Sequence, residues 1–206
     1  EFIQKVFRLE HLRVMGLMTH FPSADSDKRF TRAQIGHLYR LVSRLDRAGM
    51  IVPFVHGANS MGLAGYPTHV LNLSRPGLML YGLHPDPRSR KRLDLKPVMS
   101  VKSRVIFLKD VPKGRSISYG RTFLTRRDTR VATVPIGYSN GYFRAFSNRA
   151  DVLIGGLRCR VLGRVTMDQI MVDVTGVPGV GVGSPVGVLG RQKAEEVTAD
   201  ELAALA

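Results

Sequence analysis

The 206-residue chain contains a single cysteine, Cys159. One cysteine excludes an internal disulfide framework and a cysteine-based zinc site, and it fits a reducing compartment. No apolar run approaches the roughly 18 residues that a membrane-spanning helix needs, and the first residues contain no signal-peptide core. We therefore expect a soluble, cytoplasmic protein without a membrane partner.

Acidic residues are also scarce. Asp and Glu number 16 against 31 Lys and Arg, which gives a formal net charge of +15. Such a surplus suits phosphate or carboxylate ligands as well as nucleic acid. The densest basic run, residues 88–92, follows a proline and has no interleaved aromatic residues. This composition favours a solvated linker, so we expect no nucleic-acid partner.

Short apolar runs alternate with helical patterns over residues 1–85, which predicts βαβ units and a parallel sheet. The chain begins with a helical pattern over residues 1–12. In the long helix predicted at 31–48, Thr31 and Gln34 have capping-box spacing, and Gly49 can end the helix in a left-handed conformation. Buried strands are predicted at residues 13–20, 52–56 and 77–83. We expect both chain ends to be cut, because the first helical pattern has no capping residue ahead of it and the last one runs off the chain at Ala206. Three parallel strands also cannot close a barrel.

After a predicted linker at about residues 84–96, the hydrophobic period changes to two. Gly155 and Gly156 predict a tight hairpin, and Thr198 and Glu201 have capping-box spacing at the start of a last helix. The second half is therefore predicted to be a mostly antiparallel β domain. We place the two domains at residues 1–90 and 91–206. The alternating segments are residues 98–108, 130–136, 152–161 and 165–174.

Polar residues gather where the predicted parallel strands end, at residues 19–21, 56–60 and 74–78. Ligands of α/β sheets bind beyond these ends, so we expect His20 and the 56–60 group to share one site. The Ser60 hydroxyl and the backbone N–H groups of Gly77 and Leu78 suit a phosphate, and Arg75 adds a permanent donor. Taken singly, each histidine is more typical of a satisfied core residue.

A metal site is the alternative for these histidines. His20, His56, Asp25 and Asp27 are side chains that zinc or manganese accepts as ligands. The four residues lack the tight spacing of a metal motif. We therefore expect no metal.

Tyr119 lies in a short β-type run that stops at Gly120 and resumes with Arg121 and Phe123. This arrangement can hold a phenol at a strand end, facing a cavity. A phenol transfers protons near neutral pH only where positive charge stabilises the phenolate, and Arg121 is two residues away. Taken alone, such a tyrosine is more typical of an amphipathic cap on the core.

Two polar, glycine-containing loops interrupt the alternating pattern of the second half, at residues 137–142 and 163–169. The first contains Tyr138, and the second contains Met167 and Asp168. A polar loop of this kind is typical of a hairpin connection, and a methionine beside a strand is typical of core packing.

Together, seven blocks of the sequence resemble alanine racemase, the fold-type III family that depends on pyridoxal 5'-phosphate. The blocks occur in the family's order and cover nearly the whole chain, which makes the resemblance specific. They are residues 16–21 with 24–25, 56–60, 75–77 with 80–82, 99–105, 118–122, 135–138, and 163–164 with 167–169.

The resemblance implies a cofactor-binding (β/α)8 barrel, of which residues 1–90 are the C-terminal part, followed by the β domain. It implies a head-to-tail homodimer in which each active site is completed by the partner subunit. The implied reaction interconverts L- and D-alanine by two-base proton transfer through an aldimine of pyridoxal phosphate, and it supplies D-alanine for peptidoglycan.

The resemblance also implies roles for residues of the first half. Arg75 matches the arginine that faces the pyridine nitrogen, which it leaves unprotonated because a guanidinium practically never gives up a proton. His20 and His56 match groups that support Arg75 and the catalytic tyrosine. Phosphate and other cofactor contacts are implied for Asn59, Ser60, Gly77 and Leu78.

In the second half, Tyr119 matches the tyrosine base that takes the α-proton from the L enantiomer. The backbone N–H of Met167 matches the group that meets the substrate carboxylate. Tyr138 matches the tyrosine that narrows the entrance, and Asp168 lies beside it. The resemblance thus implies that Met167, Tyr138 and Asp168 bind the substrate.

The departures from the family matter as much. We find no counterpart of the N-terminal strand with the Schiff-base lysine, and Lys102 and Lys109 do not match it because they fall in the β domain. The arginine and modified lysine of the middle barrel strands and a C-terminal phosphate-binding tyrosine are also missing. The chain therefore resembles an internal fragment, which alone should not racemise because one of two opposing bases is missing.

Two other functions stay open at this point. One is racemisation of another amino acid, such as serine, or a broad specificity, which the pocket around Tyr138 and Met167 would decide. The other is a non-catalytic binding or assembly module that uses the basic surface.

Overall fold

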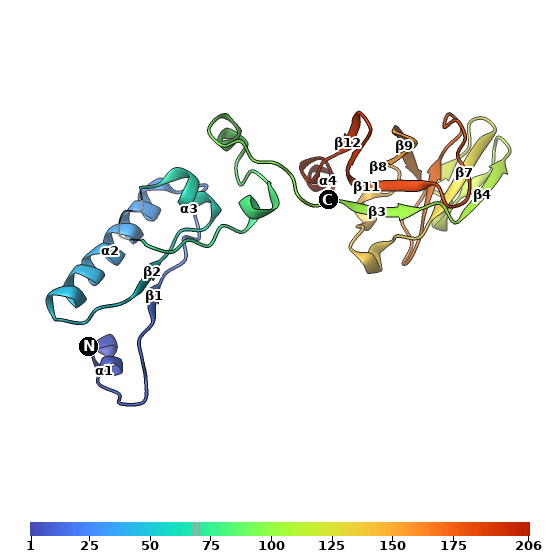
Figure 1. Ribbon diagram of the computed structural model, residues 1–206. Helices are drawn as coiled ribbons and strands as arrows, with labels where there is room; N and C mark the ends of the chain where they lie inside the picture. Colours follow the sequence, from blue (N-terminus) through green and yellow to red (C-terminus); the bar gives the residue numbers. More distant parts are fainter. Residues whose placement is uncertain (68, 70) are drawn as a thin grey trace. The chain divides into compact units, whose positions relative to one another are not determined.

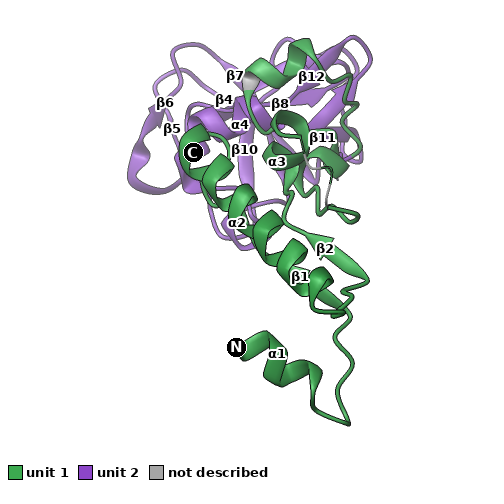
Figure 2. Ribbon diagram, turned by 90° about the vertical axis from the view of Figure 1, so that its left-hand side faces the viewer, with its two compact units in different colours: residues 1–98 green, residues 99–206 purple. Residues whose placement is uncertain are grey.

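The computed structural model describes residues 1–67, 69 and 71–206 (Figure 1). The chain forms two compact units, residues 1–98 and residues 99–206, shown in green and purple in Figure 2. We call them the first and the second unit and describe each by itself.

The first unit contains a βαβ arrangement, as the sequence predicts. Strands β1 and β2 are parallel, with Gly16 opposite Phe54 and Met18 opposite His56, and helix α2 connects them. Its small core includes Phe21, which is 1% exposed. The elements are α1 (Phe2–Phe7), β1 (Gly16–Met18), α2 (Lys28–Arg47), β2 (Phe54–His56), α3 (Ser60–Gly65), and the 3-10 helices η1 (Leu78–Tyr81) and η2 (Pro87–Lys91).

Helix α2 begins one turn earlier than predicted, and the capping box at Thr31 and Gln34 is wrong. The N-cap is Asp27, whose Oδ1 accepts a hydrogen bond from Phe30 N at 2.9 Å. Aspartate caps helices as well as threonine does. Gln34 instead donates to the Thr19 hydroxyl, at 2.9 Å, and to the His20 carbonyl, at 2.7 Å. The predicted end is confirmed, because Gly49 is left-handed with φ +69°.

The third predicted strand, residues 77–83, is also wrong, because this segment forms η1. Gly82, with φ +73°, ends η1, and a Cβ there would lie 1.9 Å from the Lys96 carbonyl oxygen. The parallel contact with β2 comes earlier in the chain, where Leu73 forms a single bridge to His56. Farther along, the predicted linker contains η2, in which Ser89 is buried.

The second unit is built on an antiparallel eight-stranded sheet in the order β12-β11-β8-β9-β10-β7-β4, with β3 paired to β11. A small hairpin of β5 and β6 lies outside it. The predicted antiparallel β domain is therefore confirmed (Figure 1). The strands are β3 (Val101–Arg104), β4 (Phe107–Val111), β5 (Ser116–Ile117), β6 (Phe123–Leu124), β7 (Thr129–Val134), β8 (Asp151–Ile154), β9 (Leu157–Leu162), β10 (Ile170–Asp173), β11 (Pro185–Gln192) and β12 (Glu195–Val197).

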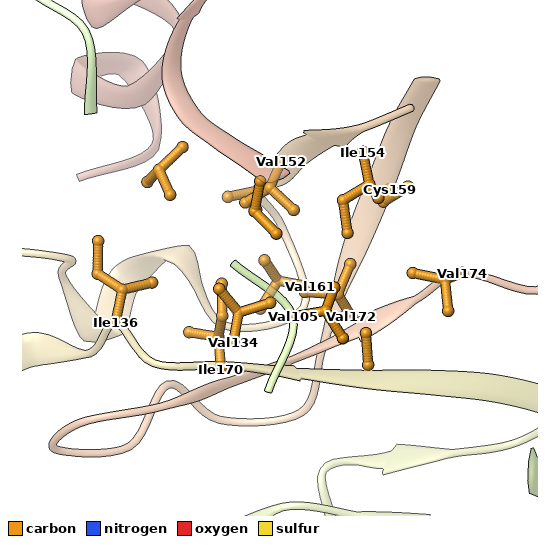
Figure 3. Close-up of a cluster of buried hydrophobic side chains, with 14 of the residues drawn as sticks. Val105, Val134, Ile136, Val152, Ile154, Cys159, Val161, Ile170, Val172 and Val174 are labelled. Carbon is orange, nitrogen blue, oxygen red and sulfur yellow. The ribbon is translucent and has the colours of Figure 1, made fainter. Parts of the chain in front are cut away.

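Alternating aliphatic residues of these strands form the core of the second unit. Val134, Val152, Val161 and Ile170 are fully buried, and Figure 3 shows them converging from different strands. β-branched side chains suit such a surface because they pack well across a pleated sheet. This core holds the loops between the strands in fixed positions.

Two predicted turns of the second unit can be compared with the structure. Gly155 and Gly156 have φ +66° and +86° between β8 and β9, which confirms the tight hairpin. At α4 (Ala199–Leu205), the Thr198 hydroxyl accepts from Glu201 N at 3.1 Å, but the Glu201 carboxylate binds Arg158 at 2.7 Å. Only the Thr198 half of that capping box is thus confirmed. Within the described residues, no helix combines the length and apolarity needed to cross a membrane.

Candidate active site

Arg75 and His56 meet at the ends of β1 and β2. The Arg75 N–H donates to the Ala58 carbonyl at 2.8 Å, and Arg75 Nη2 donates to the Thr19 carbonyl at 2.9 Å. Arg75 Nη1 contacts His56 Nδ1. The sequence places these residues far apart, and the parallel pairing of the strands brings them together.

The contact with Arg75 fixes the protonation of the His56 ring. Burial lowers the pKa of His56 below 6.5, and the positive charge of Arg75 lowers this pKa further. Because a guanidinium has only donors, Nδ1 of His56 must be the acceptor and carries no proton. His56 is therefore a neutral acceptor that orients Arg75.

His20 and Asn59 lie beside this pair. His20 is exposed, and its Nε2 is 3.5 Å from Asn59 Nδ2. The Asn59 amide is used structurally: its Oδ1 accepts from Gly62 N and its Nδ2 donates to the Phe21 carbonyl, both at 2.9 Å. Asn59 thus caps α3 and ties it to the loop after β1.

Ser60, Gly77 and Leu78 form a group of donors at the start of η1. Ser60 is buried, and its hydroxyl oxygen accepts weakly from Met79 N at 3.4 Å. Among the described residues, no acceptor pairs with the backbone N–H of Gly77 or Leu78. A hydroxyl beside two unused N–H groups suits the oxygens of a phosphate.

The two aspartates considered as metal ligands, Asp25 and Asp27, form hydrogen bonds with other groups. Asp27 caps α2, and Asp25 accepts from the Ser26 hydroxyl at 3.1 Å. In the part of the chain that the structure describes, no group of three or more His, Cys, Asp or Glu is arranged to hold a metal ion.

The second unit has a pocket of about 520 Å³ that brings together Tyr119, Tyr138, Met167 and Asp168. These four residues, which the sequence singles out, come from three separate segments. The other lining residues are Arg144, Arg164, Val165, Thr166 and Gln169. The pocket therefore combines two phenols, two guanidinium groups and exposed backbone.

Two loops form one wall of this pocket. Tyr138 N donates to the Thr166 carbonyl and Ser139 N to the Met167 carbonyl, both at 3.0 Å. The Ser139 hydroxyl donates to Asp168 Oδ1 at 2.8 Å. Within the described residues, the Met167 N–H has no acceptor. This N–H is thus available to a ligand.

Tyr119 is 72% exposed and opens the 3-10 helix η3 (Tyr119–Arg121). Arg121, which the sequence suggests as its positive neighbour, donates instead to the Ser116 hydroxyl at 3.3 Å. Arg164 lines the pocket with Tyr119, and a Cβ on Gly120 would lie 2.9 Å from Arg164 Cζ. Sequence reasoning missed Arg144 and Arg164, although Arg164 stands in the same block as Met167.

Comparison with known proteins finds similarity to alanine racemases over nearly the whole chain. The family model for the N-terminal domain of alanine racemase matches residues 1–85, and the model for its C-terminal domain matches residues 98–206. The alanine racemase of Halothermothrix orenii is 41% identical over 203 residues, which are 98% of this chain and 54% of the relative. The alanine racemase of Methanococcus maripaludis is 42% identical over 203 residues, with the same two coverages of 98% and 54%.

Solved structures of alanine racemases are also similar to this chain. An alanine racemase of Clostridium difficile in complex with cycloserine has a TM-score of 0.90 and 36% identity, over 98% of this chain and 54% of that one. An alanine racemase of Bacillus anthracis with bound L-Ala-P has a TM-score of 0.81 and 35% identity, over 92% and 49%. The chain spans about half the length of the curated relatives that it matches. These similarities show that the chain belongs to the alanine racemase family.

Proposed function

We propose that this chain is part of a pyridoxal phosphate-dependent racemase that interconverts L- and D-alanine and supplies D-alanine for peptidoglycan. The observation that carries the proposal is the second-unit pocket, where Tyr119, Arg164 and the free Met167 N–H lie together. Because the chain spans about half of its relatives, the activity belongs to the full-length protein.

We propose that residues 1–90 are part of a (β/α)8 barrel that binds the cofactor and that residues 91–206 are the C-terminal β domain. The parallel β1–β2 pair with α2 between them supports the barrel proposal. Both strands end at the polar groups of the first unit, as is usual for sites in this architecture.

We propose that the polar cluster of the first unit holds the cofactor. Pyridoxal phosphate, when bound, supplies an electron sink for the charge left after proton removal. Ser60, Gly77 and Leu78 would bind its phosphate, and Arg75, whose guanidinium has only donors, would face its pyridine nitrogen and leave it unprotonated. His56 orients Arg75, while His20 and Asn59 complete this wall.

We propose that the second unit moves one of the two protons. The Tyr119 phenolate, stabilised by the Arg164 guanidinium, takes the α-proton of the L enantiomer on its oxygen and becomes a neutral phenol. The Met167 N–H binds the substrate carboxylate, and Tyr138 and Asp168 narrow the entrance. A lysine outside this chain is the opposing base.

We propose a cytoplasmic, head-to-tail homodimer in which each active site combines residues of two subunits. The open position of Tyr119, which is 72% exposed, supports this assembly because the residue is available to a neighbouring surface.

The test is racemisation of alanine and serine by the full-length protein with pyridoxal phosphate, followed by chiral chromatography. We expect alanine to be racemised from both enantiomers and serine more slowly. A faster rate with serine would indicate a different substrate, and no racemisation of either amino acid would indicate a non-catalytic module.

A further inference from the structure

The backbone around Tyr119 adopts conformations that L-residues rarely adopt. Ser118, Gly120 and Arg121 have φ values of +63°, +69° and +51°. Only glycine adopts positive φ readily, and other residues hold it where surrounding contacts enforce it. The position of Tyr119 therefore depends on what packs against residues 118–121.

The turn at Gly163 and Arg164 packs against this segment. The Ser118 hydroxyl donates to the Arg164 carbonyl at 2.6 Å. A Cβ on Gly163 would lie 2.6 Å from the Ile117 carbonyl oxygen, so the two backbones are in close contact. A shift of this turn would therefore move the segment that carries Tyr119.

Asn148 links the two segments through one side chain. Its Oδ1 accepts from Gly163 N at 2.5 Å, and its Nδ2 donates to Thr122 Oγ1 at 3.1 Å. The preceding hydroxyl, of Ser147, accepts from Val165 N at 3.0 Å. Asn148 itself has φ +61°, which asparagine tolerates better than most residues.

We propose that Asn148 is a positioning residue for Tyr119: its amide fixes the turn at Gly163 on one side and Thr122 on the other. We call the three residues the Asn148 clamp. The inference rests on the proposed function, because it assigns the clamp to the proton transfer by Tyr119. Proton transfer depends steeply on the separation of the reacting atoms, so a small shift of Tyr119 slows it.

Three variants of the full-length protein separate positioning from stability. Asn148→Gly removes the amide and keeps a residue that tolerates positive φ. Thr122→Val removes only the oxygen that accepts from Asn148 and keeps a similar shape. Lys193→Gly is the matched control, because Lys193 also has positive φ, at +56°, but belongs to the turn between β11 and β12.

The first measurement is hydrogen exchange without added cofactor or substrate. We expect Asn148→Gly to speed exchange over residues 117–122 and at the Gly163 amide, because the Gly163 N–H loses its acceptor, Asn148 Oδ1. Thr122→Val should speed exchange over the same segment by a smaller factor. Lys193→Gly should leave both regions at the wild-type rate.

The second measurement is kinetic. We expect Asn148→Gly to lower kcat by about 10- to 100-fold with little change in KM. The primary isotope effect with α-deuterated L-alanine should rise, because removal of that deuterium by Tyr119 becomes slower. The effect with α-deuterated D-alanine should not rise, because the opposing base removes that deuterium. A loss of folded protein alone changes neither isotope effect.

Wild-type exchange rates over residues 117–122 and unchanged isotope effects in Asn148→Gly would overturn the clamp. If that variant does not fold, Thr122→Val decides by the same two measurements. If the wild-type protein racemises nothing, the proposed function falls, and hydrogen exchange alone then decides whether Asn148 fixes Tyr119.

Discussion

At the scale of single residues, the guanidinium of Arg75 influences the protonation of His56 and joins the ends of two strands. It contacts His56 Nδ1 and donates to the Thr19 carbonyl at 2.9 Å, which ties the ends of β1 and β2 together. Both burial and this cation lower the pKa of His56. A neutral acceptor beside a permanent cation is a stable pair at neutral pH, and it holds Arg75 in one orientation.

Arg75→Gln is therefore expected to raise the pKa of His56, because one of its two causes of lowering is removed. The pKa should stay below 6.5, since the larger cause, burial, remains. An NMR titration of the His56 ring in the cofactor-free protein measures this shift. Arg40→Gln, a change on the exposed surface of α2, is the control. An equal His56 pKa in both variants would refute the assignment.

Local motifs in the sequence indicated several single residues of the candidate site. They did not indicate which residues from distant segments of the chain line the same pocket. Tyr119 and Met167 stand in distinctive blocks, and the structure places both at one pocket. Arg121, which the sequence suggests as the positive charge beside Tyr119, donates to the Ser116 hydroxyl. Arg164 reaches the pocket only through folding of the second unit.

At the scale of elements, the pocket depends on two loops that approach closely. Gly137 lies where the first loop meets the second, and a Cβ there would lie 2.3 Å from the carbonyl oxygens of both Thr166 and Met167. No L-side chain fits without a shift of backbone. This approach explains why glycine precedes Tyr138.

Gly137→Ala is expected to lower the free energy of unfolding by about 1–3 kcal/mol, because the added methyl group overpacks the contact between the loops. Urea denaturation measures the change. Gly176→Ala is the control, since a Cβ there meets no atom within 4 Å. If both variants lose the same stability, steric contact at Gly137 is not the cause.

Element boundaries show the limits of sequence patterns. The antiparallel strands and the Gly155–Gly156 turn follow from period-two alternation and local glycines. The start of α2 was missed because Asp27 and Thr31 are both good N-caps, and Gln34 is recruited by Thr19 and His20. The strand predicted at residues 77–83 is wrong because an apolar run of that length fits several conformations.

At the scale of the whole molecule, ion pairs of Arg158 connect several elements of the second unit. This residue of β9 lies 3.7 Å from Asp151 on β8, 3.1 Å from Glu195 on β12 and 2.7 Å from Glu201 on α4. Its hydrogen bond to Glu201 lowers the pKa of that carboxyl below 4.5. The network therefore adds acid-sensitive stability to this unit.

The sign of the pH effect follows from the lowered pKa of Glu201. The stabilisation is complete above the unfolded pKa, about 4.3, and it is lost as the pH falls through the lower folded value. Glu201→Gln should thus lower Tm at pH 7 and reduce the fall of Tm between about pH 5 and pH 3. Thermal unfolding followed by circular dichroism measures both effects. Glu10→Gln, on an exposed residue of the first unit, should change neither.

The two units divide the proposed chemistry between them. The first unit offers a cation, a neutral histidine and hydrogen-bond donors that suit a phosphate. The second offers two phenols and two guanidinium groups at one pocket. Membership in the alanine racemase family connects them, and the proton transfer assigned to Tyr119 is the central claim.

That claim is tested most directly by racemisation with Tyr119→Phe in the full-length protein, loaded with pyridoxal phosphate. Tyr39→Phe is the matched control, because its hydroxyl donates to the Pro67 carbonyl, at 3.3 Å, and has no role in the proposed reaction. We expect Tyr119→Phe to slow racemisation of both enantiomers by at least about 10²-fold, since each direction needs both bases, while Tyr39→Phe keeps the wild-type rate. Racemisation of both enantiomers at wild-type rates by Tyr119→Phe would contradict the account.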